Sequence, residues 1–152
     1  MRQKQMGRRQ GLALAAGLIG LSLVPRPASA QMSAAARAAV DKVLAGRSAE
    51  EAGITLRLPP IAENGNTVPM TILVDSPMTD ADHIKAIHVF ADKNPTPEVA
   101  SFKLTPAMGR AQVDTRIRLG QTQDVIAVAE TSTGRMLIGH VEVKVTIGGC
   151  GG

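Results

Sequence analysis

The chain has 152 residues, with 17 lysines and arginines against 13 aspartates and glutamates, and a formal net charge of +4. This length corresponds to one domain and leaves no room for separate cofactor and substrate domains. Tryptophan and tyrosine are absent and Phe90 and Phe102 are the only phenylalanines, so the chain lacks the aromatic platforms on which single-stranded nucleic acid stacks. We therefore expect no nucleic-acid partner.

The excess of positive charge is concentrated at the N-terminus. Residues 1–30 contain five basic residues and no acidic residue, whereas residues 31–152 contain 12 basic and 13 acidic residues, a net charge of −1. Without the first thirty residues the chain is nearly neutral, so general electrostatic attraction to a polyanion is not expected of it.

The first thirty residues contain the three parts of an export signal in the required order. Residues 1–10 are charged and polar, residues 12–24 are apolar or small, and residues 28–30, Ala-Ser-Ala, fit the small-x-small pattern that signal peptidase accepts. The apolar run is shorter than the roughly 20 residues that span a bilayer as a helix. We predict cleavage after Ala30, a mature periplasmic chain of 122 residues, and no permanent membrane anchor.

Two adjacent arginines indicate the route of export. Arg8 and Arg9 precede the apolar run and resemble the twin-arginine signal of bacteria. Gly7 stands where Ser or Thr is usual, and Gly11 where a bulky apolar residue is usual. We predict a twin-arginine-type signal peptide over residues 1–30, with an ordinary Sec signal as the alternative.

One helix is predicted at the start of the mature chain. Ser33 can cap it and Gly46 can end it. Its apolar residues recur at helical spacing, at Ala36, Val40, Val43 and Leu44. Residues 48–51, Ser-Ala-Glu-Glu, form a capping-box pattern that predicts one further helical turn before Gly53.

From Ile54 onward, the hydrophobic pattern changes from helical to alternating. About seven strands are predicted, over residues 54–58, 68–74, 84–91, 99–104, 111–119, 123–131 and 136–147. Turn signals separate them at residues 64–65, 94–97 and 133–134, and Pro69 indicates an edge position or a bulge. We predict a mainly β domain over residues 31–147, an immunoglobulin-like antiparallel β-sandwich after a short N-terminal helix.

One predicted strand is apolar on both faces. Residues 125–128 read Val-Ile-Ala-Val. Two interpretations stay open: the outer face meets a partner subunit, or the strand is buried between two sheets.

The C-terminal residues 148–152 hold the only cysteine, Cys150, so an internal disulfide is impossible. A lone cysteine in an exported protein indicates an intermolecular bond or a thiol used chemically. Its neighbours predict an unhindered, flexible arm, made of Gly148, Gly149, Gly151 and Gly152. No Lys, Arg or His lies within the five residues before Cys150, and no rigid element holds a base beside it. We interpret Cys150 as a handle that carries a substrate to other enzymes.

Other residue types offer no second site. No metal-ligand spacing links the three histidines, His83, His88 and His140. The aspartates of one loop lack the spacing of a calcium-binding loop, at Asp75, Asp80 and Asp82. No nucleotide-binding loop or Ser-His-Asp arrangement is found, so we expect no resident metal or cofactor and no catalysis by the chain itself.

The ending Val-Thr-Ile-Gly-Gly-Cys-Gly-Gly and the twin-arginine-like leader resemble the SoxY family, the sulfur-carrier subunits of the periplasmic thiosulfate-oxidising Sox system. Internal segments add to the resemblance, at residues 63–65, 68–69, 88–95, 118–123 and 125–130. The resemblance implies a heterodimer with SoxZ. It also implies that SoxXA joins thiosulfate to Cys150, that SoxB removes sulfate, and that SoxCD oxidises the remaining sulfur in many organisms.

Two other classes of protein share single features with this sequence. A ubiquitin-like sulfur carrier also ends in Gly-Gly, but carries sulfur on its terminal carboxylate in the cytoplasm. A periplasmic β-sandwich binding or assembly module of the pilus-chaperone kind could share the fold, yet has no need of the arm. The export signal and Cys150 favour the Sox carrier over both.

Overall fold

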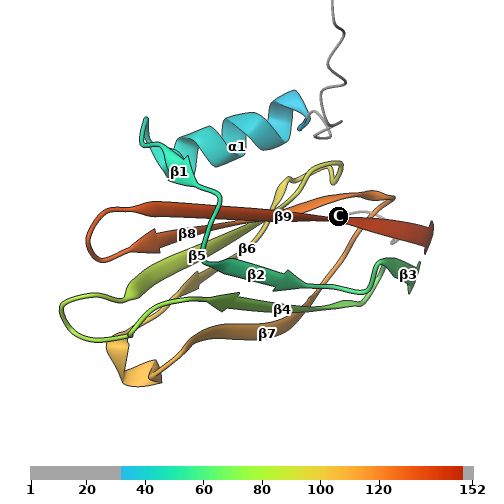
Figure 1. Ribbon diagram of the computed structural model, residues 1–152. Helices are drawn as coiled ribbons and strands as arrows, with labels where there is room; N and C mark the ends of the chain where they lie inside the picture. The colour runs from blue at the N-terminus through green and yellow to red at the C-terminus, as the bar shows by residue number, and fades with distance from the viewer. Residues whose placement is uncertain (1–31, 149–152) are drawn as a thin grey trace, which may run out of the picture.

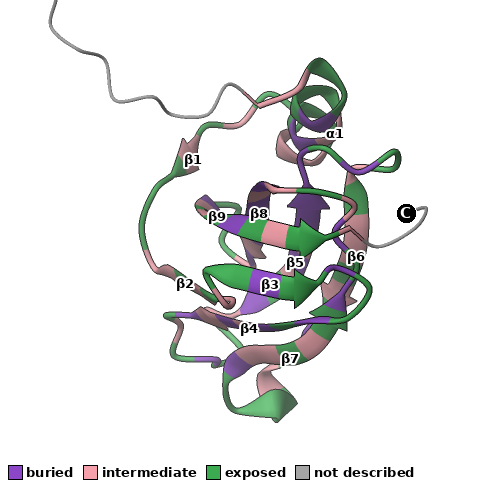
Figure 2. Cartoon of the chain, turned by 90° about the vertical axis from the view of Figure 1, so that its right-hand side faces the viewer, coloured by how far each residue is buried: buried purple, intermediate pink, exposed green. Residues whose placement is uncertain are grey.

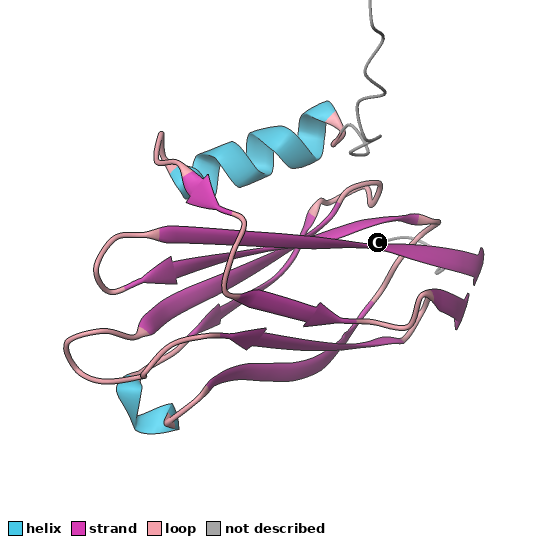
Figure 3. Ribbon diagram, viewed as in Figure 1, coloured by secondary structure: helices cyan, strands magenta, loops and turns pink. Residues whose placement is uncertain are grey.

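The computed structural model describes residues 32–148, in which one helix precedes nine strands (Figures 1 and 3). A short 3-10 helix, η1 (Pro106–Met108), lies between β6 and β7. The elements are α1 (Ala34–Leu44), β1 (Ala49–Glu50), β2 (Ile54–Arg57), β3 (Ile61–Asn64), β4 (Val68–Val74), β5 (Ile84–Ala91), β6 (Glu98–Lys103), β7 (Ala111–Ile117), β8 (Gln123–Thr131) and β9 (Met136–Ile147).

The strands form two sheets that pack face to face. The larger sheet has the order β1-β9-β8-β5-β6, with β3 also paired to β9, and the smaller sheet has the order β2-β4-β7. The long strands pair antiparallel, whereas the short strands β1 and β3 pair parallel to β9. The predicted mainly β sandwich after one short helix is confirmed.

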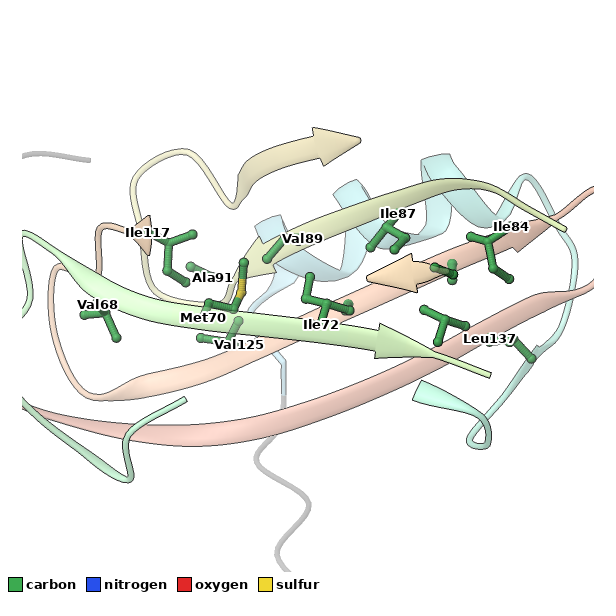
Figure 4. Packing of buried hydrophobic residues seen from close by; sticks show 14 of the residues in the cluster. Val68, Met70, Ile72, Ile84, Ile87, Val89, Ala91, Ile117, Val125 and Leu137 are labelled. Atoms are coloured by element: carbon green, nitrogen blue, oxygen red, sulfur yellow. The ribbon is translucent and has the colours of Figure 1, made fainter. Parts of the chain in front are cut away.

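The main core lies between the sheets. Along β4, buried residues alternate with more exposed ones, and Figure 4 shows Val68, Met70 and Ile72 pointing toward residues of the larger sheet. Val89 and Val125 meet them there, both fully buried. Each fully buried Val or Leu stabilises the fold by about 1.5–3 kcal/mol, so aliphatic side chains suffice for this core.

The outer face of the larger sheet is covered by α1 (Figure 1). The hydroxyl of Ser33 accepts a hydrogen bond from the Ala36 N–H, as expected of an N-cap. Ile126 and Val128 of β8 belong to the cluster beneath α1, whereas the neighbouring Val125 and Ala127 belong to the main core. Both interpretations of the doubly apolar strand were therefore wrong: the chain's own helix covers its second face.

Residues 49–50 correct another prediction. They form β1, paired in parallel with Met136 and Leu137, and not a helical turn. The exposed edge of β9 offers backbone hydrogen bonds along its length, and a single turn without an apolar face has nothing to bury. The same edge pairs with β3, which the alternation of apolar residues did not predict because Ala62 is its only buried residue (Figure 2).

Pro69, which was predicted to mark an edge position or a bulge, stands in the middle strand of the smaller sheet. It pairs with Arg116 of β7, whereas β2 accompanies β4 only from Thr71 to Val74. Pro69 thus lies at a point where β4 has a neighbour on one side, which is where a residue without an N–H is tolerated.

Candidate functional site

The predicted carrier residue and three arm glycines lie outside the described residues: Cys150, Gly149, Gly151 and Gly152. The signal residues Arg8 and Arg9 and the predicted cleavage position Ala30 lie outside them as well. What the structure does describe is the part of the domain from which the C-terminal residues depart. We call it the arm end, formed by residues 65, 92–97, 118–124 and 145–148.

Hydrogen bonds hold the last residues of β9 at the arm end. The Val145 N–H donates a hydrogen bond of 2.9 Å to the Thr122 hydroxyl. The Ile147 carbonyl accepts one of 2.7 Å from the Gly65 N–H, and the Gly65 carbonyl accepts one of 2.8 Å from the Leu119 N–H. The end of β9 is thereby tied to the loop that joins β7 to β8, both directly and through Gly65.

Gly148 lies against the same loop. The backbone of Gly120 occupies the volume that a Cβ at position 148 would need, with the Gly120 carbonyl oxygen as its nearest atom and the carbonyl carbon 3.1 Å from it. The φ angle of Gly148 lies outside the left-handed region. Glycine is therefore required here for close approach, a property that its flanking position in the motif did not reveal.

Two buried amide side chains bond to this loop. They are Asn94, which is 6 % exposed, and Gln123, which is 2 % exposed. Asn94 Nδ2 donates to the Arg118 carbonyl (2.8 Å), and Asn94 Oδ1 accepts from the Gly120 N–H (3.0 Å) and from Gln123 Nε2 (2.9 Å). Gln123 Nε2 also donates to the Gln121 carbonyl, and its Oε1 accepts from the Lys93 N–H at 2.7 Å. Sequence reasoning treated Asn94 only as a turn residue and missed this network.

The titrating group with a shifted pKa at the arm end is Asp124, on β8. Burial raises the pKa of Asp124; the charge of His140 opposes that rise, and the charges of Glu142 and Asp92 add to it. The carboxylate form is thus less favoured in the folded protein than in water.

The remaining candidates from the sequence do not converge. His83 Nδ1 lies 3.0 Å from the Thr79 carbonyl, His88 is on β5, and His140 is on β9 opposite Ile126. Among residues 32–148, no group of three or more His, Cys, Asp and Glu side chains could hold a metal ion. Nor does any helix in that part of the chain combine the length and hydropathy needed to span a membrane.

Cross-strand pairing creates one cluster that sequence spacing could not reveal. His88 Nδ1 lies 3.0 Å from the Ser101 hydroxyl and 3.4 Å from the Glu98 carboxylate. Both partners meet the same ring nitrogen, so the imidazole cannot pass a proton from serine to carboxylate as in a hydrolytic triad. The cluster is a surface contact between β5 and β6.

A pocket of about 190 Å³ lies at the opposite end of the sandwich, with Asp75, Asp82 and Arg135 in its wall. We call this the far end, formed by residues 47–50, 82–85 and 130–135. The Arg135 guanidinium is engaged by Glu50 at 2.8 Å, and that hydrogen bond lowers the pKa of Glu50. Two of the three loop aspartates, Asp75 and Asp82, thus line a pocket, and no cation site is formed among the described residues.

With this geometry in place, the chain can be compared with known proteins. Residues 40–150 match the family model described as "Sulfur oxidation protein SoxY". The solved structure of the sulfur carrier protein SoxY from Chlorobium limicola f thiosulfatophilum is 31% identical, with a TM-score of 0.62, over 74% of this chain and 97% of that one. No curated protein matches the chain.

Other solved structures are similar in fold alone. A superoxide reductase (neelaredoxin) from Ignicoccus hospitalis is 14% identical with a TM-score of 0.55, over 62% of this chain and 80% of that one. A putative superoxide reductase from Thermotoga maritima is 20% identical with a TM-score of 0.52, over 63% and 87%. The family match covers well over half of the chain and extends to its only cysteine, and we conclude that this chain belongs to the SoxY family of sulfur oxidation proteins.

Proposed function

We propose that this chain is the covalent carrier of sulfur intermediates in thiosulfate oxidation, and that the intermediates are bound to Cys150. The observation that carries the proposal is the SoxY match, which runs through residue 150 and so includes the only cysteine. Likeness to a solved sulfur carrier protein supports the carrier role.

The proposed loading step is oxidative. The Cys150 thiol and the outer sulfur of thiosulfate form a sulfur–sulfur bond, one proton is released, and two electrons pass to the haem-containing partner SoxXA. The product is a cysteine S-thiosulfonate. Since the Cys150 segment carries no nearby base, activation of the thiol is assigned to the partner enzyme.

The proposed unloading step is hydrolytic. Water attacks the sulfonate sulfur, the bond between that sulfur and the adjacent sulfane sulfur breaks, and hydrogensulfate leaves. The sulfane sulfur stays on Cys150 as a persulfide. SoxB is the proposed hydrolase, and SoxCD the proposed oxidant of the persulfide.

The site of action and the partner subunit belong to the same proposal. The leader with Arg8, Arg9 and Ala30 supports export to the periplasm by the twin-arginine route, which carries folded proteins. SoxZ, which has no signal of its own, can then cross the membrane as a heterodimer with this chain. The carrier itself needs no resident cofactor in this scheme.

Intact-mass analysis of the mature protein from thiosulfate-grown cells tests the proposal. We expect adducts of sulfane sulfur or thiosulfonate on the unsubstituted chain, and none on Cys150→Ala, whose cells lose thiosulfate oxidation. Ser101→Ala, which removes an exposed hydroxyl of β6, is the control and keeps the adducts. An unmodified cysteine, together with full thiosulfate oxidation by Cys150→Ala, would overturn the proposal.

A further inference from the structure

We infer that Asn94 and Gln123 are positioning residues for Cys150: their buried amides hold the loop of residues 118–121 as a support on which Gly148 lies. That support sets the point and direction at which the chain leaves the domain. The inference rests on the proposed function, because it gives the support a purpose only if Cys150 carries sulfur.

The backbone of residues 118–121 bonds to two side chains and is not part of a sheet. Residues 118–121 lie between β7 and β8. Three of their backbone groups bond to the two amides, namely the Arg118 and Gln121 carbonyls and the Gly120 N–H. The amides also bond to each other at 2.9 Å, so the loop and the two side chains form one connected network.

This network reaches the end of β9. Thr122, which follows the loop, accepts from the Val145 N–H, and Leu119 within the loop donates to Gly65, which in turn donates to Ile147. Gly148 then rests on Gly120 with room only for hydrogen on its Cα. The contacts of Val145, Ile147 and Gly148 therefore all depend on the position of this loop.

Cys150 follows Gly148 by two residues, so at 3.3–3.6 Å per residue its Cα lies within about 7 Å of that of Gly148. With the departure point fixed, covalent geometry limits the thiol to positions close to Gly148. Confinement raises the frequency with which a docked enzyme meets the thiol in the right orientation. Because both supporting side chains are uncharged, this confinement does not depend on their titration.

Gly148→Ala is the direct test, because an added Cβ must displace Gly148 from Gly120. Cys150 is the only cysteine, so a nitroxide label on Cys150 and a second one on exposed Lys103→Cys give one distance distribution by pulsed electron resonance. We expect Gly148→Ala to shift and broaden that distribution and to slow sulfur loading of unlabelled protein in extracts of thiosulfate-grown cells. A misplacement of about 1 Å can slow a reaction up to about 100-fold.

The matched control is Gly134→Ala, in the turn between β8 and β9 at the far end. Its φ of +88° strains an alanine while nothing lies within 4 Å of the added Cβ, so this variant loses stability without touching the arm end. We expect an unchanged distance distribution and normal loading. Asn94→Ala, which removes the support from below, is expected to broaden the distribution as Gly148→Ala does.

Superimposable distributions for Gly148→Ala and the unsubstituted protein would overturn the inference, as would equal broadening in Gly134→Ala. Neither result depends on sulfur chemistry. Conversely, a displaced label in a protein whose cysteine never receives sulfur would refute the proposed function and leave the structural role of the support intact.

Discussion

The two ends of the sandwich are held by different chemistry. At the arm end, the buried side chains beneath the loop of residues 118–121 are the neutral amides of Asn94 and Gln123. At the far end, the polar contacts are ion pairs, with Glu130 meeting Arg47 at 2.9 Å and Lys85 at 3.6 Å, and Glu50 meeting Arg135. The amide network at the arm end is neutral, whereas these contacts at the far end depend on charge.

The difference has a consequence for pH. The hydrogen bond from Arg47 lowers the pKa of Glu130, and the charge of Lys85 adds to the effect. A carboxylate with a lowered pKa contributes stability above its unfolded pKa and loses it as the pH falls through its folded pKa. At the arm end the shift of Asp124 is in the opposite direction. Acid therefore weakens the far end, whereas the departure point of the C-terminal residues keeps its uncharged support.

The largest expected effect comes from breaking the amide network. Asn94→Ala removes three hydrogen bonds, those that Asn94 makes with the Arg118 carbonyl, the Gly120 N–H and Gln123 Nε2. Each buried group left unsatisfied costs about 1–3 kcal/mol, so we expect the free energy of unfolding in urea to fall by about 2–3 kcal/mol. Asn64→Ala, which removes an exposed acceptor for the Asn66 N–H, is the control with a loss of a few tenths of a kcal/mol. Equal losses in the two variants would contradict a special role for the arm-end amide.

A smaller effect is expected at the far end. Glu130→Gln removes the negative charge that faces both Arg47 and Lys85. Because these two side chains are partly exposed, we expect the free energy of unfolding at neutral pH to fall by about 1 kcal/mol or less. Because protonation removes the same charge, the difference from the unsubstituted protein should shrink as the pH falls through the lowered pKa of Glu130. Urea unfolding at several pH values measures it, with exposed Glu63→Gln as the control. A stability difference that grows as the pH falls would contradict the lowered pKa of Glu130.

The smallest expected effect has the opposite sign. Burial penalises the charged form of Asp124 and Glu142 adds like charge, so Asp124→Asn should raise the free energy of unfolding at neutral pH by about 0.5 kcal/mol or less. The gain should shrink as the pH falls through the raised pKa and vanish below the unfolded pKa of Asp124, because residue 124 is then neutral in both states of both proteins. Thermal unfolding of the two proteins at matched pH checks this. A loss of stability in Asp124→Asn would mean that its carboxylate is favoured at the arm end.

Several elements were predictable because their pattern is local. The alternation along residues 68–74 coincides with β4, the apolar run within residues 123–131 lies in β8, and Ser33 caps α1 as its residue type indicates. Residues 49–50 and 61–64 were not predicted as strands, because they are short, largely exposed and held by the edge of β9. Their structure comes from a partner strand and not from their own periodicity.

By itself, the sequence determined the mainly β class, the position of the helix and the lone cysteine among glycines that points to a carrier, since each of these depends on residues close together in the chain. The tertiary structure alone decided that α1 covers Ile126 and Val128, and that Gly148 lies on Gly120 above Asn94 and Gln123. Those contacts join residues far apart in sequence, and they follow from strand register and sheet packing, which no local pattern specifies.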